Sequence, residues 1–60
     1  MPRLSIGDRV YVHPPLRLSD GTLISEAQVF GFEGDRVVVS YFVSEDISKA
    51  VVDKAILEKM

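Results

Sequence analysis

The sequence predicts an all-β domain of about five short strands, and three observations carry this prediction. Residues 9–13 alternate polar and apolar side chains, as a strand with one buried face does. Two strongly apolar runs, residues 26–32 and 36–43, flank the turn sequence Glu33-Gly34-Asp35, which is the pattern of a β-hairpin. Glycine and proline fall between the apolar runs and mark strand ends and turns.

The chain before the hairpin is expected to hold one strand and a long loop. In the strand at residues 9–13, Val10 and Val12 should point inward, because successive strand side chains face opposite ways. Pro14-Pro15 should end this strand, since proline donates no ladder hydrogen bond. Residues 14–24 then read as a long loop around the turn sequence Ser19-Asp20-Gly21-Thr22.

The chain after residue 43 is expected to form a polar loop, a fourth strand, a single 3₁₀ turn capped by Asp53 and a closing strand. These elements are placed at residues 44–48, 49–52, 53–56 and 57–60. The alternative is one helix over residues 44–60, which Ala50 and Leu57 favour and the β-branched pair Val51-Val52 opposes.

Size and composition restrict the classes of function. The 60 residues suffice for one domain, placed at residues 1–60, and a domain this small buries only about 60% of its unfolded surface. The chain has no cysteine and one histidine, His13, so neither disulfides nor a structural zinc site should stabilise it. Dense packing or association with another surface should do so instead, which the hydrophobic fraction of 47% allows.

Charge and hydropathy also restrict the partners. Seven basic and nine acidic residues give a net charge of −2, which disfavours a nucleic-acid partner because phosphate contacts draw on a basic excess. No apolar run approaches the roughly 20 residues that span a bilayer. The N-terminus lacks the apolar core of a signal peptide. We therefore expect a cytoplasmic protein without membrane insertion.

No group of residues has the pattern of an active site. His13 has no obvious partner for acid–base work or metal binding. Glu45-Asp46 lacks the ligand count and spacing of a calcium loop. No helix start follows Gly31 or Gly34, so they should permit a bulge or bend and a turn, rather than hold phosphate. We expect no enzyme, no cofactor and no metal.

The hairpin is apolar on both of its faces. On the second hairpin strand, four alternate residues should face one way and three the other: Val37, Val39, Tyr41 and Val43 against Val38, Ser40 and Phe42. On the first strand, Phe30 and Phe32 should share the face opposite Ala27, Val29 and Gly31. One face fills the interior, and the other must be covered by the loop at residues 14–24, a second copy of the chain or a partner.

Several segments resemble SH3-like barrels. They are Gly7-Asp8-Arg9-Val10, Val29-Phe30-Gly31-Phe32, the hairpin strand Arg36-Val37-Val38-Val39-Ser40-Tyr41, and the ending Val51-Val52-Asp53-Lys54-Ala55-Ile56-Leu57-Glu58-Lys59. The order of strand, long loop, hairpin, short strand, 3₁₀ turn and terminal strand is similar to theirs. The resemblance implies a small SH3-like barrel, with a long first loop and a 3₁₀ turn before the last strand.

Families with this order of elements differ in function. KOW-type modules occur in ribosomal and transcription proteins, and small accessory subunits of photosynthetic electron-transfer complexes dock proteins against one another. The type II dihydrofolate reductase has a similar start and close, and builds one pore from four chains. Its Val-Gln-Ile-Tyr stretch would align with Lys49-Ala50-Val51-Val52, where the glutamine and tyrosine are absent. The resemblance therefore does not imply that activity.

These observations predict a non-enzymatic protein-binding module, acting as a homo-oligomer or as a small subunit of a larger complex, in which an exposed edge strand adds backbone pairing. Its expected anchors are aromatic: Tyr11, Phe30, Phe32, Tyr41 and Phe42. The alternative is a KOW-like module that touches RNA or a ribonucleoprotein through Arg9, Arg17 and Arg36. A third hypothesis, by analogy with the reductase, is an oligomer whose pore binds a small ligand.

Overall fold

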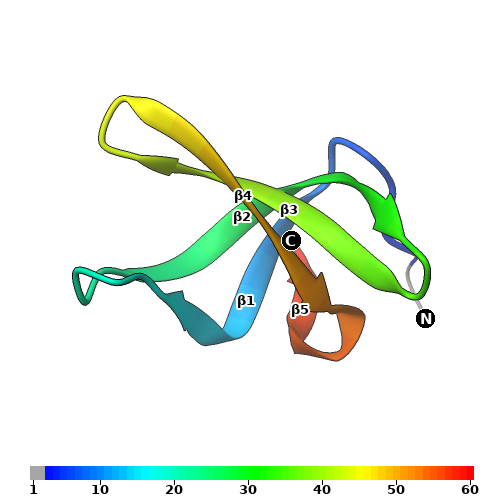
Figure 1. Cartoon of the computed structure of the whole chain (residues 1–60). Coiled ribbons are helices and arrows are strands. Elements are labelled where there is room, and N and C mark those ends of the chain that lie inside the picture. The colour runs from blue at the N-terminus through cyan, green and yellow to red at the C-terminus, as the bar shows by residue number, and fades with distance from the viewer. Residues whose placement is uncertain (1–2) are drawn as a thin grey trace.

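A computed structural model describes residues 3–60. Its five strands form one antiparallel sheet in the order β4-β3-β2-β1-β5 (Figure 1). The elements in chain order are β1 (Arg9–Arg17), β2 (Leu23–Glu33), β3 (Arg36–Val43), β4 (Asp46–Asp53), the 3₁₀ helix η1 (Lys54–Ile56) and β5 (Leu57–Lys59). Within residues 3–60 no ladder joins β4 to β5, so the sheet stays open and these two strands are its edges.

The core lies on the inner face of a strongly twisted sheet (Figure 1). The chain leaves β4 through η1 and returns beside β1, where β5 pairs Leu57 with Val12 and Lys59 with Val10. The buried residues come from alternate positions of four strands, as the alternation of the pleat requires. They are Val10, Val12, Ala27, Val29, Val37, Val39 and Val52. Valine dominates because its branched side chain packs well on a pleated surface.

The hairpin of β2 and β3 confirms the most local part of the sequence analysis. β3 has the expected bounds, and Gly34 turns the chain with φ +64°, a conformation that glycine adopts without steric cost. The ladder shifts register between Val29 and Gly31, which confirms the expected bulge or bend.

The same bulge makes one expectation wrong. One extra residue in β2 reverses the alternation beyond it, so that Gly31 lies opposite Val38 and Phe32 opposite Val37. Phe32 therefore shares the face of the core residue Val37 and does not share a face with Phe30.

The long loop expected at residues 14–24 is also wrong, because most of this segment is strand. β1 continues through Pro14-Pro15 to Arg17, and β2 begins at Leu23. The β1–β2 ladder is irregular between Tyr11 and Leu16, and the prolines lie inside this irregular stretch, where no ladder N–H is required of them.

The turn expected at residues 19–22 is confirmed, at the tip of the β1–β2 hairpin. The Leu18 N–H donates to the Thr22 carbonyl at 2.8 Å, and Gly21 has φ +90°. The Asp20 carboxylate accepts the Thr22 N–H at 2.9 Å, which lowers the pKa of that carboxyl.

The C-terminal segment confirms the 3₁₀ turn and excludes the single helix over residues 44–60. The Asp53 carboxylate accepts the Ala55 N–H at 3.0 Å and caps η1. β4 is longer than expected and begins at Asp46, since the turn needs only the residues around Ser44, which has φ +57°. Residues 3–60 contain no helix with the length and apolar character needed to cross a membrane.

Candidate functional site

The outer face of the sheet, opposite the valine core, carries large exposed apolar side chains. Cross-strand neighbours on this face are Phe42 and Ile47, Ser40 and Lys49, and Val38 and Val51. Four side chains form what we call the outer apolar patch: Phe30, 52% exposed, Phe42, 70%, Ile47, 61%, and Val51, 42%. They come from β2, β3 and β4, and the bends at Leu18 to Thr22 do not cover them, so the outer face remains open in the single chain.

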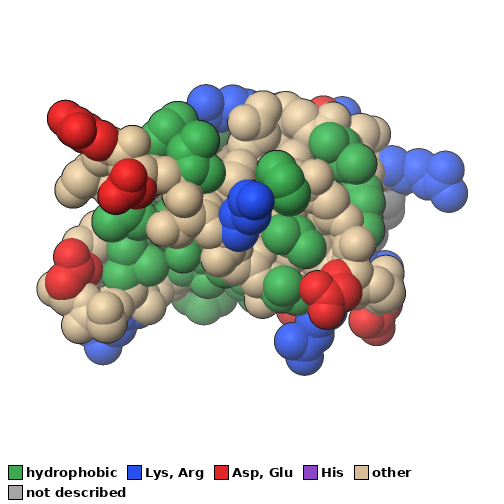
Figure 2. Space-filling model, turned by 45° about the horizontal axis from the view of Figure 1, so that its top comes forward, with side chains coloured by type: hydrophobic (Ala, Val, Ile, Leu, Met, Phe, Trp, Pro, Cys, Tyr) green, Lys and Arg blue, Asp and Glu red, His purple; other side chains and the backbone are tan. Residues whose placement is uncertain are grey.

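The β2 bulge and Lys49 together position Phe30. The ammonium of Lys49 lies 4.1 Å from the centroid of the Phe30 ring, in cation–π geometry. Since Lys49 is on β4 and Phe30 on β2, this contact reaches across β3. Along β4, Lys49 separates Ile47 from Val51, and Figure 2 shows apolar side chains on both sides of a basic side chain near the middle of one face.

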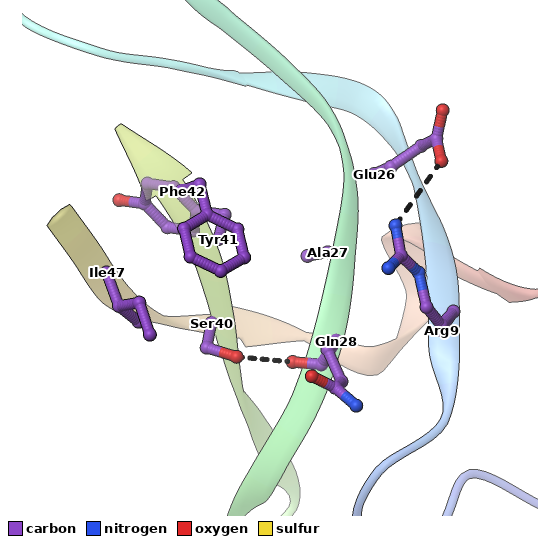
Figure 3. A pocket seen from close by; sticks show the side chains of 8 residues that line it. All are labelled: Arg9, Glu26, Ala27, Gln28, Ser40, Tyr41, Phe42 and Ile47. Atoms are coloured by element: carbon purple, nitrogen blue, oxygen red, sulfur yellow. Dashed lines mark hydrogen bonds and ion pairs between the residues drawn. The ribbon is translucent and has the colours of Figure 1, made fainter. Parts of the chain in front are cut away.

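A small groove of about 100 Å³ borders the patch (Figure 3). Phe42 and Ile47 stand on one side of it, and the ion pair between Arg9 Nη2 and Glu26 Oε1, at 3.8 Å, stands on the other. On its floor, the Ser40 hydroxyl donates to the Gln28 carbonyl at 3.4 Å. Ligand pockets usually enclose about 300–1,000 Å³. The groove is therefore of a size to receive a single side chain of a partner protein, between an apolar and a charged wall.

The structure divides the five aromatic residues that the sequence marked as anchors. Phe30 and Phe42 share the outer face. Tyr41 is half-buried against the core, and Phe32 is half-exposed opposite Val37 near the hairpin turn. Tyr11 lies on the outer side of β1 opposite Glu26 and Glu58, with its ring 6.0 Å from that of His13. Its surroundings are polar and charged.

Two members of the outer apolar patch were not predicted from the sequence. Ile47 falls in the segment expected to be a polar loop. Because β4 begins at Asp46, Ile47 is instead a strand residue on the outer face. Val51 lies in an expected strand, and the alternation of Lys49 and Val51 with buried Val52 would have placed it outward.

The three arginines of the RNA hypothesis do not form one cluster. Arg9 and Arg17 begin and end β1, so that seven residues, including the irregular stretch of this strand, lie between them. Arg36 begins β3, opposite Glu33 and Asp53. Arg9 forms an ion pair with Glu26, and Arg36 has acidic residues opposite it on both neighbouring strands, so the local charge is mixed.

His13 lies near one carboxylate. Its Nε2 atom is 3.8 Å from Glu58 Oε1, and both side chains are mostly exposed, which makes the contact a weak surface pair. Among residues 3–60, no group of three or more His, Cys, Asp or Glu side chains is arranged to hold a metal ion.

No protein-family model, no curated protein and no solved structure matches this chain. Function is therefore inferred from the geometry and chemistry of its own residues.

Proposed function

We propose that this chain is a protein-binding module of the SH3-like barrel type, without catalytic activity, that docks through its outer apolar patch. The order of the elements, with a 3₁₀ turn between β4 and the closing β5, supports the barrel type. The observation that carries the docking function is the exposure of Phe30, Phe42, Ile47 and Val51 on one face of a 60-residue chain. Large apolar side chains that are exposed together on one face mark interaction sites.

The magnitude of the apolar contribution indicates how such a complex would be held. Fully burying one large apolar side chain contributes about 1.5–3 kcal/mol, and these four are already about half buried, so covering them contributes roughly 4 kcal/mol. Association costs at least about 4 kcal/mol in lost freedom of motion. The patch therefore supplies the anchors, and a stable complex also needs the groove beside Phe42 or the backbone of the β4 edge.

A paired substitution tests this function. Phe42→Ser combined with Ile47→Ser removes two anchors that are not part of the core, so the fold should survive, as circular dichroism can verify. Leu23→Ser is the matched control, since Leu23 is also more than half exposed but lies at the far end of β2, opposite Arg17. We expect the double variant to weaken a complex in which a partner covers Phe42 and Ile47 by at least about tenfold.

The opposite result is equally clear. The proposal is wrong if the wild-type chain forms no complex that the double variant loses and Leu23→Ser keeps. We do not propose the RNA-associated alternative, because Arg9, Arg17 and Arg36 lie apart and two of them face acidic residues.

A further inference from the structure

β4 is an edge strand with few of the features that normally protect an edge. It pairs with β3 in unbroken register, from Arg36 opposite Asp53 to Val43 opposite Asp46, without a bulge or a proline. Edge strands are usually protected by shortness, bulges, prolines or charges. The charged residues of β4 are Asp46 and Asp53 at its ends and Lys49 in its middle. β5, the other edge, is only three residues long. The free side of β4 is therefore the better template for an added strand.

Charge selects one register if the added strand is β4 of a second copy. Two antiparallel copies related by a two-fold axis through a residue of β4 present the same face on the same side. An axis at Lys49 places two lysines opposite each other, which is unfavourable. An axis at Ala50 places Ile47 opposite Asp53. An axis at Val51 places the two Val51 side chains opposite each other and pairs Lys49 with Asp53 twice.

Both charged groups are able to make this pair. Lys49 is exposed, and its flexible stem lets the ammonium turn from Phe30 toward a neighbouring strand. Asp53 uses Oδ1 to cap η1 through the Ala55 N–H, which leaves Oδ2 for a second contact. The interchain pair therefore does not require the loss of the cap.

We infer that this chain pairs with a second copy of itself, β4 to β4, about a two-fold axis at Val51. The inference goes beyond the proposed function, because the pairing joins the two outer faces into one surface and leaves Phe30, Phe42 and Ile47 open to a further partner. Backbone hydrogen bonds along β4 hold the pair together. The pairing covers Val51, a patch residue of the edge strand, with its own copy.

Cross-linking tests this register directly, because the natural chain has no cysteine. Directly opposite Cα atoms in an antiparallel pair are about 4.5–5.5 Å apart, within the range of a disulfide. Mild oxidation of Val51→Cys should therefore yield a covalent dimer. Lys49→Cys is the matched control, on the same face of the same strand, and its thiols would be roughly 13 Å out of register. We expect Val51→Cys to cross-link at least about tenfold faster.

Charge changes give a second readout that does not depend on oxidation. Lys49→Glu places like charges opposite each other twice, and Asp53→Asn removes the attraction while keeping a good helix cap. We expect Lys49→Glu to weaken the dimer by about tenfold and Asp53→Asn to weaken it less, as measured by sedimentation equilibrium.

Two results would overturn the inference. One is Lys49→Cys cross-linking as fast as Val51→Cys. The other is a wild-type chain that sediments as a monomer, together with the failure of both Val51→Cys and Lys49→Cys to form a disulfide-linked dimer on oxidation. If that monomer still binds another protein, and Phe42→Ser with Ile47→Ser abolishes the binding, the docking function stands and only self-pairing is refuted. If the monomer binds no other protein, both self-pairing and the docking function are refuted.

Discussion

The ammonium of Lys49 lies 4.1 Å from the centroid of the Phe30 ring, so that a residue of the edge strand β4 contacts the bulge of β2 across β3. The contact links three strands on the outer face and places a positive charge in the middle of the outer apolar patch. The contact covers part of the Phe30 ring and leaves half of the surface of this side chain open.

This contact should be measurable as a coupling between the two side chains. Lys49→Met keeps most of the apolar stem and removes the charge, and Phe30→Leu removes the ring. Exposed cation–π pairs contribute about 0.5–1 kcal/mol, so the double-mutant cycle should give a coupling of this size in urea unfolding. Additive effects of the two substitutions would show that the contact does not stabilise the fold.

The two faces of the sheet should respond differently to the same substitution. Val39 is completely shielded in the core, and we expect Val39→Ala to cost about 2–3 kcal/mol through lost burial and an unfilled cavity. Val51→Ala deletes the same atoms from a position that is 42% exposed and should cost less than about 1 kcal/mol. Urea unfolding of dilute protein measures both, and equal costs would contradict the assignment of inner and outer faces.

Two glycines of the central hairpin should also differ. Gly34 has φ +64°, where an added Cβ is strained, so Gly34→Ala should cost about 1–2 kcal/mol. Gly34→Asn should cost less, because asparagine tolerates this conformation. Gly31 sits at the bulge with φ outside the left-handed region, and no atom would lie within 4 Å of an added Cβ. Gly31→Ala should therefore be tolerated in thermal unfolding, and a loss as large as that of Gly34→Ala would be inconsistent with this backbone.

The turn at the tip of the β1–β2 hairpin should depend on pH. The Thr22 N–H stabilises the ionised Asp20 carboxylate and lowers its pKa in the folded state. A lowered folded-state pKa gives a contribution to stability that is present above the unfolded pKa and is lost as pH falls through the folded pKa. Carboxyl NMR titration should give a lower midpoint for Asp20 in the folded chain than in urea. Equal midpoints would show that the turn contact is absent in solution.

The sequence foretold those elements whose signals are local. The Glu33-Gly34-Asp35 turn, the bounds of β3 and the Asp53 cap of η1 all follow from residues within a few positions of each other. The continuation of β1 past Pro14-Pro15 did not, because the register irregularity that accommodates the prolines is set by pairing with β2. Alternation alone also failed after the bulge, where one extra residue moved Phe32 to the face of Val37.

The candidate site was predictable only in part for the same reason. An apolar hairpin with two apolar faces was evident from residues 36–43, and Phe30 and Phe42 do lie on its outer face. The partners that complete the patch, Ile47 and Val51, come from β4, whose start and register depend on contacts with β3. Tyr11 and Tyr41 were grouped with the patch by residue type, and the sheet places one among charged neighbours and the other against the core.

The most direct test of the docking face is sedimentation velocity of fluorescently labelled protein, in buffer and in extract of the source cells. We predict a species in extract that is heavier than the species in buffer, lost when Phe42→Ser and Ile47→Ser are combined and retained in Leu23→Ser. The same species in both media, or a complex in extract that the double substitution leaves unchanged, would contradict the assignment of the outer apolar patch as a docking face.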